Sequence, residues 1–307
     1  QFLQVFFFSF CMIRARGRAG NKRGLGACKR VDGRRLVAKT APNLKKPTII
    51  THILDGISEA GAAWSELALK KKLKKETITC LQLGGSACFD FDDNQVIHDT
   101  IPTNLASLFP RLGIEGDLPG NLFITDKHPV TSKLVASVVN GSSATPVLKT
   151  ALEYVRKPSV PHLSLGREGQ WNHMHRHDQN LFVQMTGRKG WVMIPGKNLP
   201  KKFITPSQPR VVNSEVQEGI FDQRTLCSYV MTCERWMDFA NEDRDCTRQA
   251  VEEARRNSAV NQYGGYVCDV KQGEALFVPD GWWHGTCNLE AWNAGFAIVA
   301  EMRNEEL

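Results

Sequence analysis

Residues 273–289, GEALFVPDGWWHGTCNL, decide how the C-terminal half of this chain of 307 residues folds. A short apolar run ends at Pro279, a turn signal follows at Asp280-Gly281, and a second run begins with two tryptophans. Short runs of β-forming residues bounded by Gly and Pro are typical of antiparallel strands joined by tight turns. His284 stands at the start of the second strand, where the turn and the strand together would fix its position.

The same texture begins at His162 and continues to the end of the chain. Short strands are expected at HLSLG, NLFVQM, GWVMIPG and KFITPS, and again at GGYVCDV, EALFVP, WHGTCNL and NAGFAIVAE. Between the two groups, a segment at about 226–257 is dense in charge and favours a helix. This arrangement predicts a mostly β fold with a double-stranded β-helix core, of the jelly-roll or cupin type, with flanking and inserted α-helices.

Three parts of the chain are expected. Residues 1–46 would be a basic, disordered leader or targeting segment, 47–160 would form α/β elements packed on the barrel, and 161–303 would form the barrel. Within the second part the pattern predicts one helix over 58–75 and another near 130–139.

Three histidines fall at every second position of WNHMHRHDQN, namely His173, His175 and His177. Because alternate residues of a strand share a face, their imidazoles would line one side while Asp178 points away. Neutral imidazole is the commonest metal ligand in proteins. A third ligand must come from another strand, so the prediction is a metal site of His175, His177 and His284, with His173 at its rim.

The alternative is that these histidines are exposed, or are core residues held by hydrogen bonds. A single histidine is more often of that kind. Protonated imidazoles packed together repel each other by about 1–4 kcal/mol per pair, depending on the local dielectric. A shared metal ion removes this repulsion and adds coordination energy, which favours the metal site for a cluster.

Two blocks of the sequence resemble the JmjC and cupin-like (cupin-8 type) oxygenases, a family that includes asparaginyl and other protein hydroxylases. The blocks are GQWNHMHRHDQNLFVQMTGRKGWVMIPG and, further along, VKQGEALFVPDGWWHGTCNLE. The resemblance covers roughly residues 160–300, and the second block carries it most specifically. It implies a double-stranded β-helix that holds Fe(II), uses 2-oxoglutarate as co-substrate and takes O2 as oxidant.

The resemblance also implies the roles of the metal ligands. His284 matches the distal ligand of the family, and His175-x-His177 stands where the family has His-x-Asp or His-x-Glu. The histidine at 177 departs from that pattern. Asp178 is the nearest acid, and it is a possible carboxylate ligand if a bulge turns it toward the metal.

Two further residues match co-substrate contacts of the family. Lys189, in the GRK motif, matches the lysine that binds the distal carboxylate of 2-oxoglutarate, and Asn180 matches a polar contact near it. In a strand over 187–195, Lys189 shares a face with Trp191 and Met193, and a lysine buried there is costly without an anion. The alternative is that this face points outward and Lys189 is solvated.

The function expected from these features is an Fe(II)/2-oxoglutarate-dependent dioxygenase, an oxidoreductase that hydroxylates a protein or peptide side chain. Two histidines and one carboxylate are diagnostic of that class, and this sequence offers three histidines. A three-histidine metal cupin that acts as a dioxygenase or isomerase without 2-oxoglutarate therefore remains an alternative. A non-catalytic metal-binding module is another.

The net charge of +7 is concentrated near the N-terminus, because the segment from Arg14 to Lys46 holds twelve Lys or Arg and one acid. Such a run predicts a transit-like targeting segment, or a disordered arm that could contact nucleic acid, although nucleic acid is not the favoured partner. The apolar run before it is too short for a membrane span of about 20 residues.

The nine cysteines include no CxxC pair, and scattered unpaired cysteines favour a reducing compartment over a disulfide framework. An intracellular protein is therefore expected, in the cytoplasm, the nucleus or an organelle reached through the N-terminal segment.

Overall fold

The computed structural model of the chain describes residues 26–36, 44–55, 58–83, 86–89, 101–104, 109, 122–124, 129–140, 145–157, 159–199, 201, 204–205, 208–212 and 263–300. The helix expected at about 226–257 lies outside these segments.

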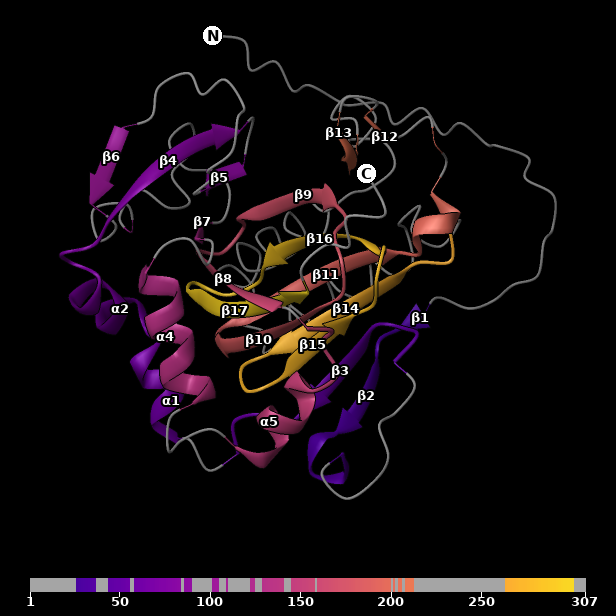
Figure 1. The fold of residues 1–307 in the computed structure, drawn as a ribbon, viewed down its shortest axis with the longest axis horizontal. Coiled ribbons are helices and arrows are strands. Elements are labelled where there is room, and N and C mark those ends of the chain that lie inside the picture. The colour runs from indigo at the N-terminus through magenta and orange to yellow at the C-terminus, as the bar shows by residue number, and fades with distance from the viewer. Residues whose placement is uncertain are drawn as a thin grey trace, which may run out of the picture.

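Strands are the commonest element of the described chain, and they form two sheets (Figure 1). The first sheet has seven strands, in the order β1 (Gly26–Ala27), β14 (Tyr266–Lys271), β11 (Arg188–Ile194), β16 (Trp283–Asn288), β9 (Trp171–His175), β13 (Gln208–Val212) and β12 (Ile204–Thr205). The second has ten, in the order β2 (Lys29–Asp32), β3 (Thr48–Thr51), β15 (Ala275–Val278), β10 (Asn180–Thr186), β17 (Asn293–Ala300), β8 (Ser159–Gly166), β7 (Leu122–Ile124), β5 (Ser86–Phe89), β4 (Thr77–Leu83) and β6 (Ile101–Asn104).

The strands of the core alternate between the sheets along the chain. β8 lies in the second sheet, β9 in the first, β10 in the second and β11 in the first, and β14 to β17 repeat the alternation from the first sheet. Neighbours within each sheet of this core are antiparallel. This winding is a double-stranded β-helix, so the predicted mostly β fold of the cupin type is confirmed.

Helices cover the outer face of the second sheet (Figure 1). Leu181 and Val183 of β10 lie in one buried cluster with residues of α2 (Glu66–Lys72), α4 (Pro129–Val139) and α5 (Pro146–Leu152). Because side chains alternate along a strand, Asn180, Phe182 and Gln184 face the other way, into the space between the sheets. The helix packing therefore decides which side of β10 faces the interior.

The helix expected over 58–75 is two helices, α1 (Ser58–Ala63) and α2. Ser65 has an extended backbone and its hydroxyl accepts a hydrogen bond from the Ala68 amide, so it caps a new helix where the pattern predicted a continuous one. The helix near 130–139 is confirmed as α4. The sequence did not predict α5, which Thr145 caps by accepting a hydrogen bond from the Leu148 amide.

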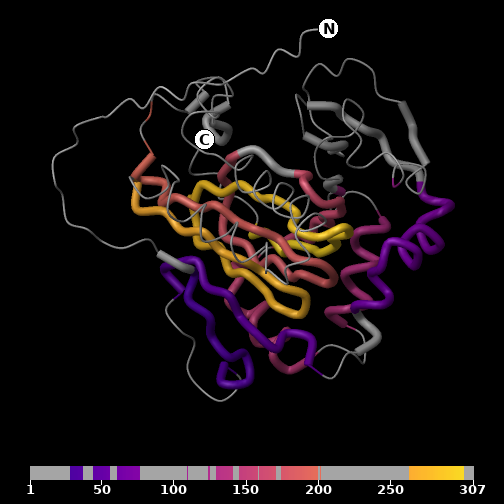
Figure 2. Tube along the Cα trace, turned by 180° about the vertical axis from the view of Figure 1, so that it is seen from behind, coloured from indigo at the N-terminus to yellow at the C-terminus, as the bar shows by residue number. Residues whose placement is uncertain are grey.

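Residues 26–36 belong to the segment that was expected to be disordered, and for them that prediction is wrong. β1 pairs with β14, β2 pairs with β3, and the 3-10 helix η1 (Gly33–Arg35) follows. Cys28, between β1 and β2, forms a disulfide with Cys268 of β14. Figure 2 shows the indigo N-terminal segment from behind, alongside the orange strands. Because Cys28 and Cys268 are joined, the expectation of unpaired cysteines is also wrong for this pair.

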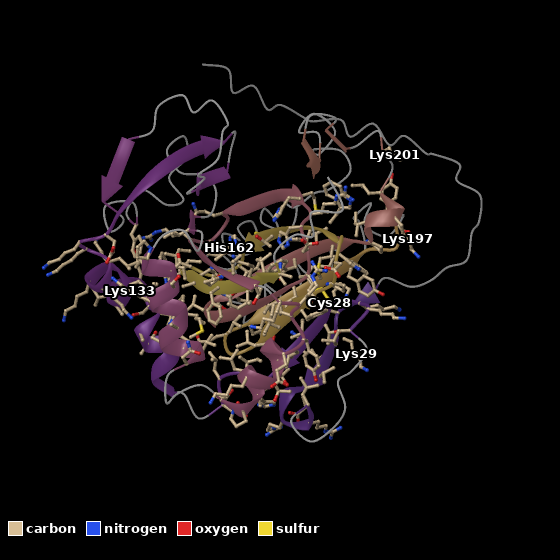
Figure 3. All side chains as sticks on the ribbon, in the orientation of Figure 1. Cys28, Lys29, Lys133, His162, Lys197 and Lys201 are labelled. Carbon is tan, nitrogen blue, oxygen red and sulfur yellow. A yellow bond between two sulfur atoms is a disulfide. The ribbon has the colours of Figure 1, made fainter. Side chains whose placement is uncertain are left out.

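The described surface carries positive charge on more than one side. Lys133 on α4 and Lys197 in the 3-10 helix η3 (Gly196–Asn198) are exposed and lie at opposite ends of the molecule (Figure 3).

None of the helices in the described segments is long and apolar enough to cross a membrane.

Two glycines with positive φ test how tightly the barrel turns are packed. At Gly187 (φ 79°) a Cβ would collide with the Trp292 carbonyl oxygen and lie 2.7 Å from Asn293 Oδ1, whereas at Gly273 (φ 79°) nothing lies within 4 Å. Gly273→Ala should therefore lower the free energy of unfolding only by the backbone strain of a positive φ, about 1–2 kcal/mol. Gly187→Ala should lower the free energy of unfolding by about 3 kcal/mol or more, because the clash adds to the backbone strain. Urea unfolding measures both, and equal losses would contradict the packing described for the β10–β11 turn.

Candidate metal centre

Antiparallel pairing of two strands brings the first two histidines together. His175 is the last residue of β9, His284 is the second residue of β16, and the two are directly opposite in the sheet register. Their ring centroids lie 4.3 Å apart. The distant segments that the sequence assigned to one metal site therefore meet in the structure.

His177 reaches the same place from the turn after β9. The strand ends at His175, so the expectation of an extended segment through residue 178 is wrong beyond that point. The His177 carbonyl accepts a hydrogen bond from the Gly281 amide at 3.3 Å, which ties this turn to the turn before β16. The His177 ring centroid lies 4.6 Å from that of His284. The side chain of His173 is outside the described part of the chain.

Backbone carbonyls fix the tautomers of two of the three imidazoles. His284 Nδ1 lies 2.9 Å from the Trp282 carbonyl oxygen, and His177 Nδ1 lies 2.6 Å from the Asp178 carbonyl oxygen. A carbonyl oxygen only accepts hydrogen bonds, so both Nδ1 atoms carry the proton and both Nε2 atoms carry a lone pair. These two Nε2 atoms are 3.1 Å apart. Two lone pairs face each other at that distance, which is unfavourable unless a cation lies between them.

The geometry fits a divalent metal ion. Ligand atoms of His175, His177 and His284 all lie within 4.8 Å of one another. Two nitrogens bonded to one metal at about 2.1 Å and at right angles lie about 3 Å apart, which matches the Nε2 pair. Burial, and next the neighbouring His175 and His177, hold the pKa of His284 well below its usual value, so its imidazole stays neutral and able to bind a metal.

Asp178 does not join this group. Its carboxylate pairs with Arg156, at 3.4 Å from Arg156 Nη2, and it is not among the clustered ligand atoms of the described residues. The alternative in which a bulge turns Asp178 toward the metal is therefore not supported. Arg156 lies 22 residues before Asp178, outside the histidine motif, and no local pattern around residue 178 predicts the pairing.

Lys189 points into the interior from β11. Its register partner is Asn288, while Met193 of the same strand is opposite His284, so Lys189 and His284 lie on one interior face. Lys189 is only 2% exposed. Its Nζ donates a hydrogen bond to Ser164 Oγ at 2.6 Å and lies 4.9 Å from the centre of the Phe182 ring. Burial lowers the pKa of Lys189 to about 7, and no acid of the described residues contributes to that shift.

Polar atoms without partners gather on the same interior faces. Asn180 Oδ1, Trp191 Nε1 and Thr286 Oγ1 are buried and have no hydrogen-bond partner among the described residues. Trp191 and Thr286 are register partners, and they lie between the level of His284 and that of Lys189. Buried polar groups are nearly always hydrogen-bonded. This interior therefore suits a polar ligand, and an anion in particular, because of Lys189.

Ser164 is a residue that the sequence interpretation missed. The signal was present in HLSLG, where Leu163 and Leu165 alternate with polar residues. The leucines pack in the cluster under the helices, so the polar residues of β8 face the interior. Trp191 was considered only as a neighbour of Lys189, yet its ring also contacts His284, with centroids 5.7 Å apart.

The cost of burying Lys189 should appear in the pH dependence of stability. The pKa is about 7 in the folded protein and 10.5 in the unfolded chain, so between these values the unfolded chain binds more protons and stability rises with pH. Below pH 7 both states are protonated and the folded protein carries the full cost, roughly 5 kcal/mol. Lys189→Met should remove this rise in urea unfolding between pH 7 and 10. Lys197→Met, at an exposed position, is the control, and an unchanged slope in Lys189→Met would contradict the burial.

Removing one imidazole should destroy metal binding, whereas removing the nearby carboxylate should not. His284→Ala is expected to lose stoichiometric binding of Co2+, because two half-buried histidines alone make a weak site. Asp178→Asn is expected to keep it. The visible absorption of bound Co2+ measures both variants. Tight binding by His284→Ala, or its loss in Asp178→Asn, would refute the ligand set.

Comparison with known families agrees with the fold. The family model of the cupin-like domain matches residues 39–299, which extends well before the two blocks that carry the sequence resemblance. No curated protein matches the sequence. The three-histidine group in this fold indicates a metal-binding cupin. The chain therefore belongs to the cupin-like domain family.

Proposed function

We propose that the protein is an Fe(II)/2-oxoglutarate-dependent oxygenase that hydroxylates a side chain of a protein or peptide. One observation carries the proposal: a lysine without an acidic partner among the described residues is buried on the same interior face as His284. A cation buried in this way is costly unless an anion joins it. A metal at the imidazoles and a cation deeper in the barrel together suit a ligand with an acid group at each end.

The residues present fit this pair of cofactor and co-substrate. His175, His177 and His284 would hold the iron. Lys189 would hold the distal carboxylate as a charge-assisted pair, with the Ser164 hydroxyl beside it. Iron and 2-oxoglutarate, when bound, supply the oxidising power that inserts one oxygen atom of O2 into a C–H bond, with succinate and CO2 as by-products.

The side chains around the site have supporting tasks. Asn180 Nδ2 lies 3.3 Å from His177 Nε2, and its Oδ1 has no hydrogen-bond partner among the described residues, so Asn180 can contact a ligand bound at the metal. Phe182 and Trp191 pack against each other, with ring centroids 5.1 Å apart. They form an apolar wall that excludes water beside Lys189 and so strengthens its attraction for a carboxylate.

The open side of the site supports a bulky substrate. His175 and His177 are half-buried, whereas His284 is fully buried. Residues 159–162 of β8 are also half-buried, while 163–166 are buried. A side chain carried by a protein or peptide could therefore approach the metal without entering the barrel.

A second candidate function rests on the third imidazole. His177 occupies the position of the carboxylate that is diagnostic of 2-oxoglutarate oxygenases, and Asp178 is held away by Arg156. A three-histidine cupin, either a dioxygenase or an isomerase, would bind its substrate directly at the metal without 2-oxoglutarate. A non-catalytic metal-binding module would bind the metal alone.

Anaerobic titration of the Fe(II) protein with 2-oxoglutarate separates these functions. The oxygenase should develop a metal-to-ligand charge-transfer band in the visible as the keto acid binds. Lys189→Ala should keep its iron and bind 2-oxoglutarate about 100-fold more weakly, because a buried charge pair is lost. Lys197→Ala, at an exposed position, should bind as the wild type does.

Each other outcome has a definite meaning. Iron binding without the band in the wild type would refute the oxygenase and favour the three-histidine cupin or the binding module. A band with unchanged affinity in Lys189→Ala would refute the role of the lysine. Succinate formed under air by the wild type, in proportion to 2-oxoglutarate consumed, would distinguish an enzyme from a binding module.

A further inference from the structure

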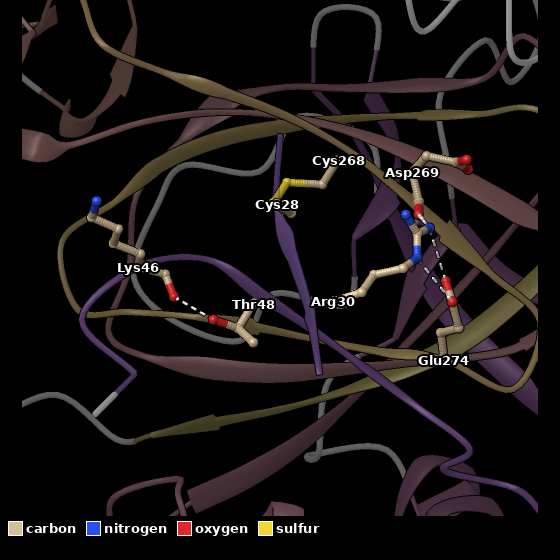
Figure 4. Close-up of a disulfide and its surroundings, with 7 residues drawn as sticks. All are labelled: Cys28, Arg30, Lys46, Thr48, Cys268, Asp269 and Glu274. Atoms are coloured by element: carbon tan, nitrogen blue, oxygen red, sulfur yellow. Dashed lines mark hydrogen bonds and ion pairs between the residues drawn. A yellow bond between two sulfur atoms is a disulfide. The ribbon is translucent and has the colours of Figure 1, made fainter. Parts of the chain in front are cut away.

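The N-terminal segment closes one edge of the barrel. β1 extends the first sheet beside β14, and β2 joins the second sheet through β3, which is itself paired with β15. Residues 26–32 therefore pass from one sheet to the other at the edge formed by β14 and β15. Cys28 stands at the crossing, and its disulfide to Cys268 is the covalent link between this segment and the barrel (Figure 4).

Four register pairs with β3 hold β2, but among the described residues few contacts besides the disulfide hold residues 26–28. β1 contributes two register pairs, Gly26 with Tyr266 and Ala27 with Val267. Arg30 donates a hydrogen bond to the Asp269 carbonyl at 2.6 Å and pairs with Glu274 at 3.2 Å (Figure 4), but its side chain is 41% exposed. Exposed ion pairs contribute little to stability. The attachment at residues 26–28 therefore depends mainly on the covalent bond.

The disulfide lies next to the wall of the metal centre. Cys268 is the register partner of Trp191, and Cys28, Cys268, Phe182 and Trp191 belong to one buried cluster. Trp191 in turn contacts the ring of His284. A continuous series of packed side chains thus connects the sulfur atoms with a metal ligand, so loosening the edge would loosen the wall behind His284.

We propose that the Cys28–Cys268 disulfide is a redox switch that holds the N-terminal segment against the barrel. Its reduction by a thiol would weaken metal binding at the three-histidine centre. In the opening step the disulfide takes up two electrons and two protons and becomes two thiols. A dithiol such as dithiothreitol supplies them and is itself oxidised to its cyclic disulfide. Cys28 is 7% exposed and sits beside the short strand β1, so local opening of that strand gives the reductant access. The inference rests on the three-histidine centre and does not depend on 2-oxoglutarate chemistry.

Mapping the cross-link is the first part of the test. The full chain is purified without reductant, its free thiols are alkylated, and it is digested for mass spectrometry. A peptide pair joined through Cys28 and Cys268 is expected. Across dithiothreitol buffers of defined reduced-to-oxidised ratio, the fraction of this pair should follow a two-electron curve. Alkylation of both cysteines in the protein before any reductant is added would overturn the proposal.

The second part measures how reduction of the disulfide changes stability and metal affinity. Wild-type protein is reduced with dithiothreitol, desalted anaerobically and titrated with Co2+, beside the oxidised protein. Reduction should lower the melting temperature by roughly 5–10 °C and the Co2+ affinity at least about fivefold. Cys28→Ser should show the lower melting temperature and the lower Co2+ affinity before any reductant is added. Cys287 is also disulfide-bonded, so Cys287→Ser is the matched control: it lacks that second bond and should still respond to reductant as the wild type does.

The remaining outcomes are decisive as well. A lower melting temperature with unchanged Co2+ affinity would show a structural staple and overturn the coupling to the metal. No Co2+ binding by the oxidised wild type would overturn the metal centre itself, and the inference with it. Failure of 2-oxoglutarate binding alone would leave the inference standing, because the Co2+ titration contains no co-substrate. If Cys28→Ser does not fold, reduced Cys287→Ser still supplies the comparison, because among the described cysteines the Cys28–Cys268 bond is then the one that reductant opens.

Discussion

Two imidazole nitrogens with opposed lone pairs are the constraint on which the functional interpretation depends. The Nε2 atoms of His177 and His284 lie 3.1 Å apart, and in the neutral rings neither can donate, since the proton of each ring is on Nδ1 and bonds a backbone carbonyl. The fold imposes this arrangement. β9 and β16 pair so that His175 and His284 are opposite, and the turns after β9 and before β16 bond to each other. A metal ion bound here would turn the repulsion into coordination.

Two strands beside this centre direct polar side chains toward the interior of the barrel. On β8 and β10 the aliphatic side chains point outward, where Leu163 and Leu181 pack beneath the helices, and the polar ones point inward. The helices thus satisfy the hydrophobic requirement of the second sheet, which leaves the interior free to hold Ser164 and Lys189. An interior of this kind is expensive in the absence of a ligand. That expense is consistent with a site built to bind an anion beside a metal.

Local patterns predicted the core of the fold well, because short runs of β-forming residues bounded by Gly or Pro indicate strands directly. They also predicted that His175, His177 and His284 would meet. They failed where the conformation of a residue depends on a partner outside its own stretch of sequence. The disulfide joins residues 240 positions apart, so the order of residues 26–36 could not be predicted from their own basic composition. Asp178 was left open as a ligand, since its orientation depends on Arg156, outside the motif.

X-ray absorption spectroscopy of the protein loaded with one equivalent of Fe(II), without co-substrate, tests the central claim most directly, because it counts the ligands around the metal. The account predicts three imidazoles bound to one ion, with the remaining positions taken by water. Only one or two imidazoles at the metal, or a protein carboxylate in the ligand set, would contradict it.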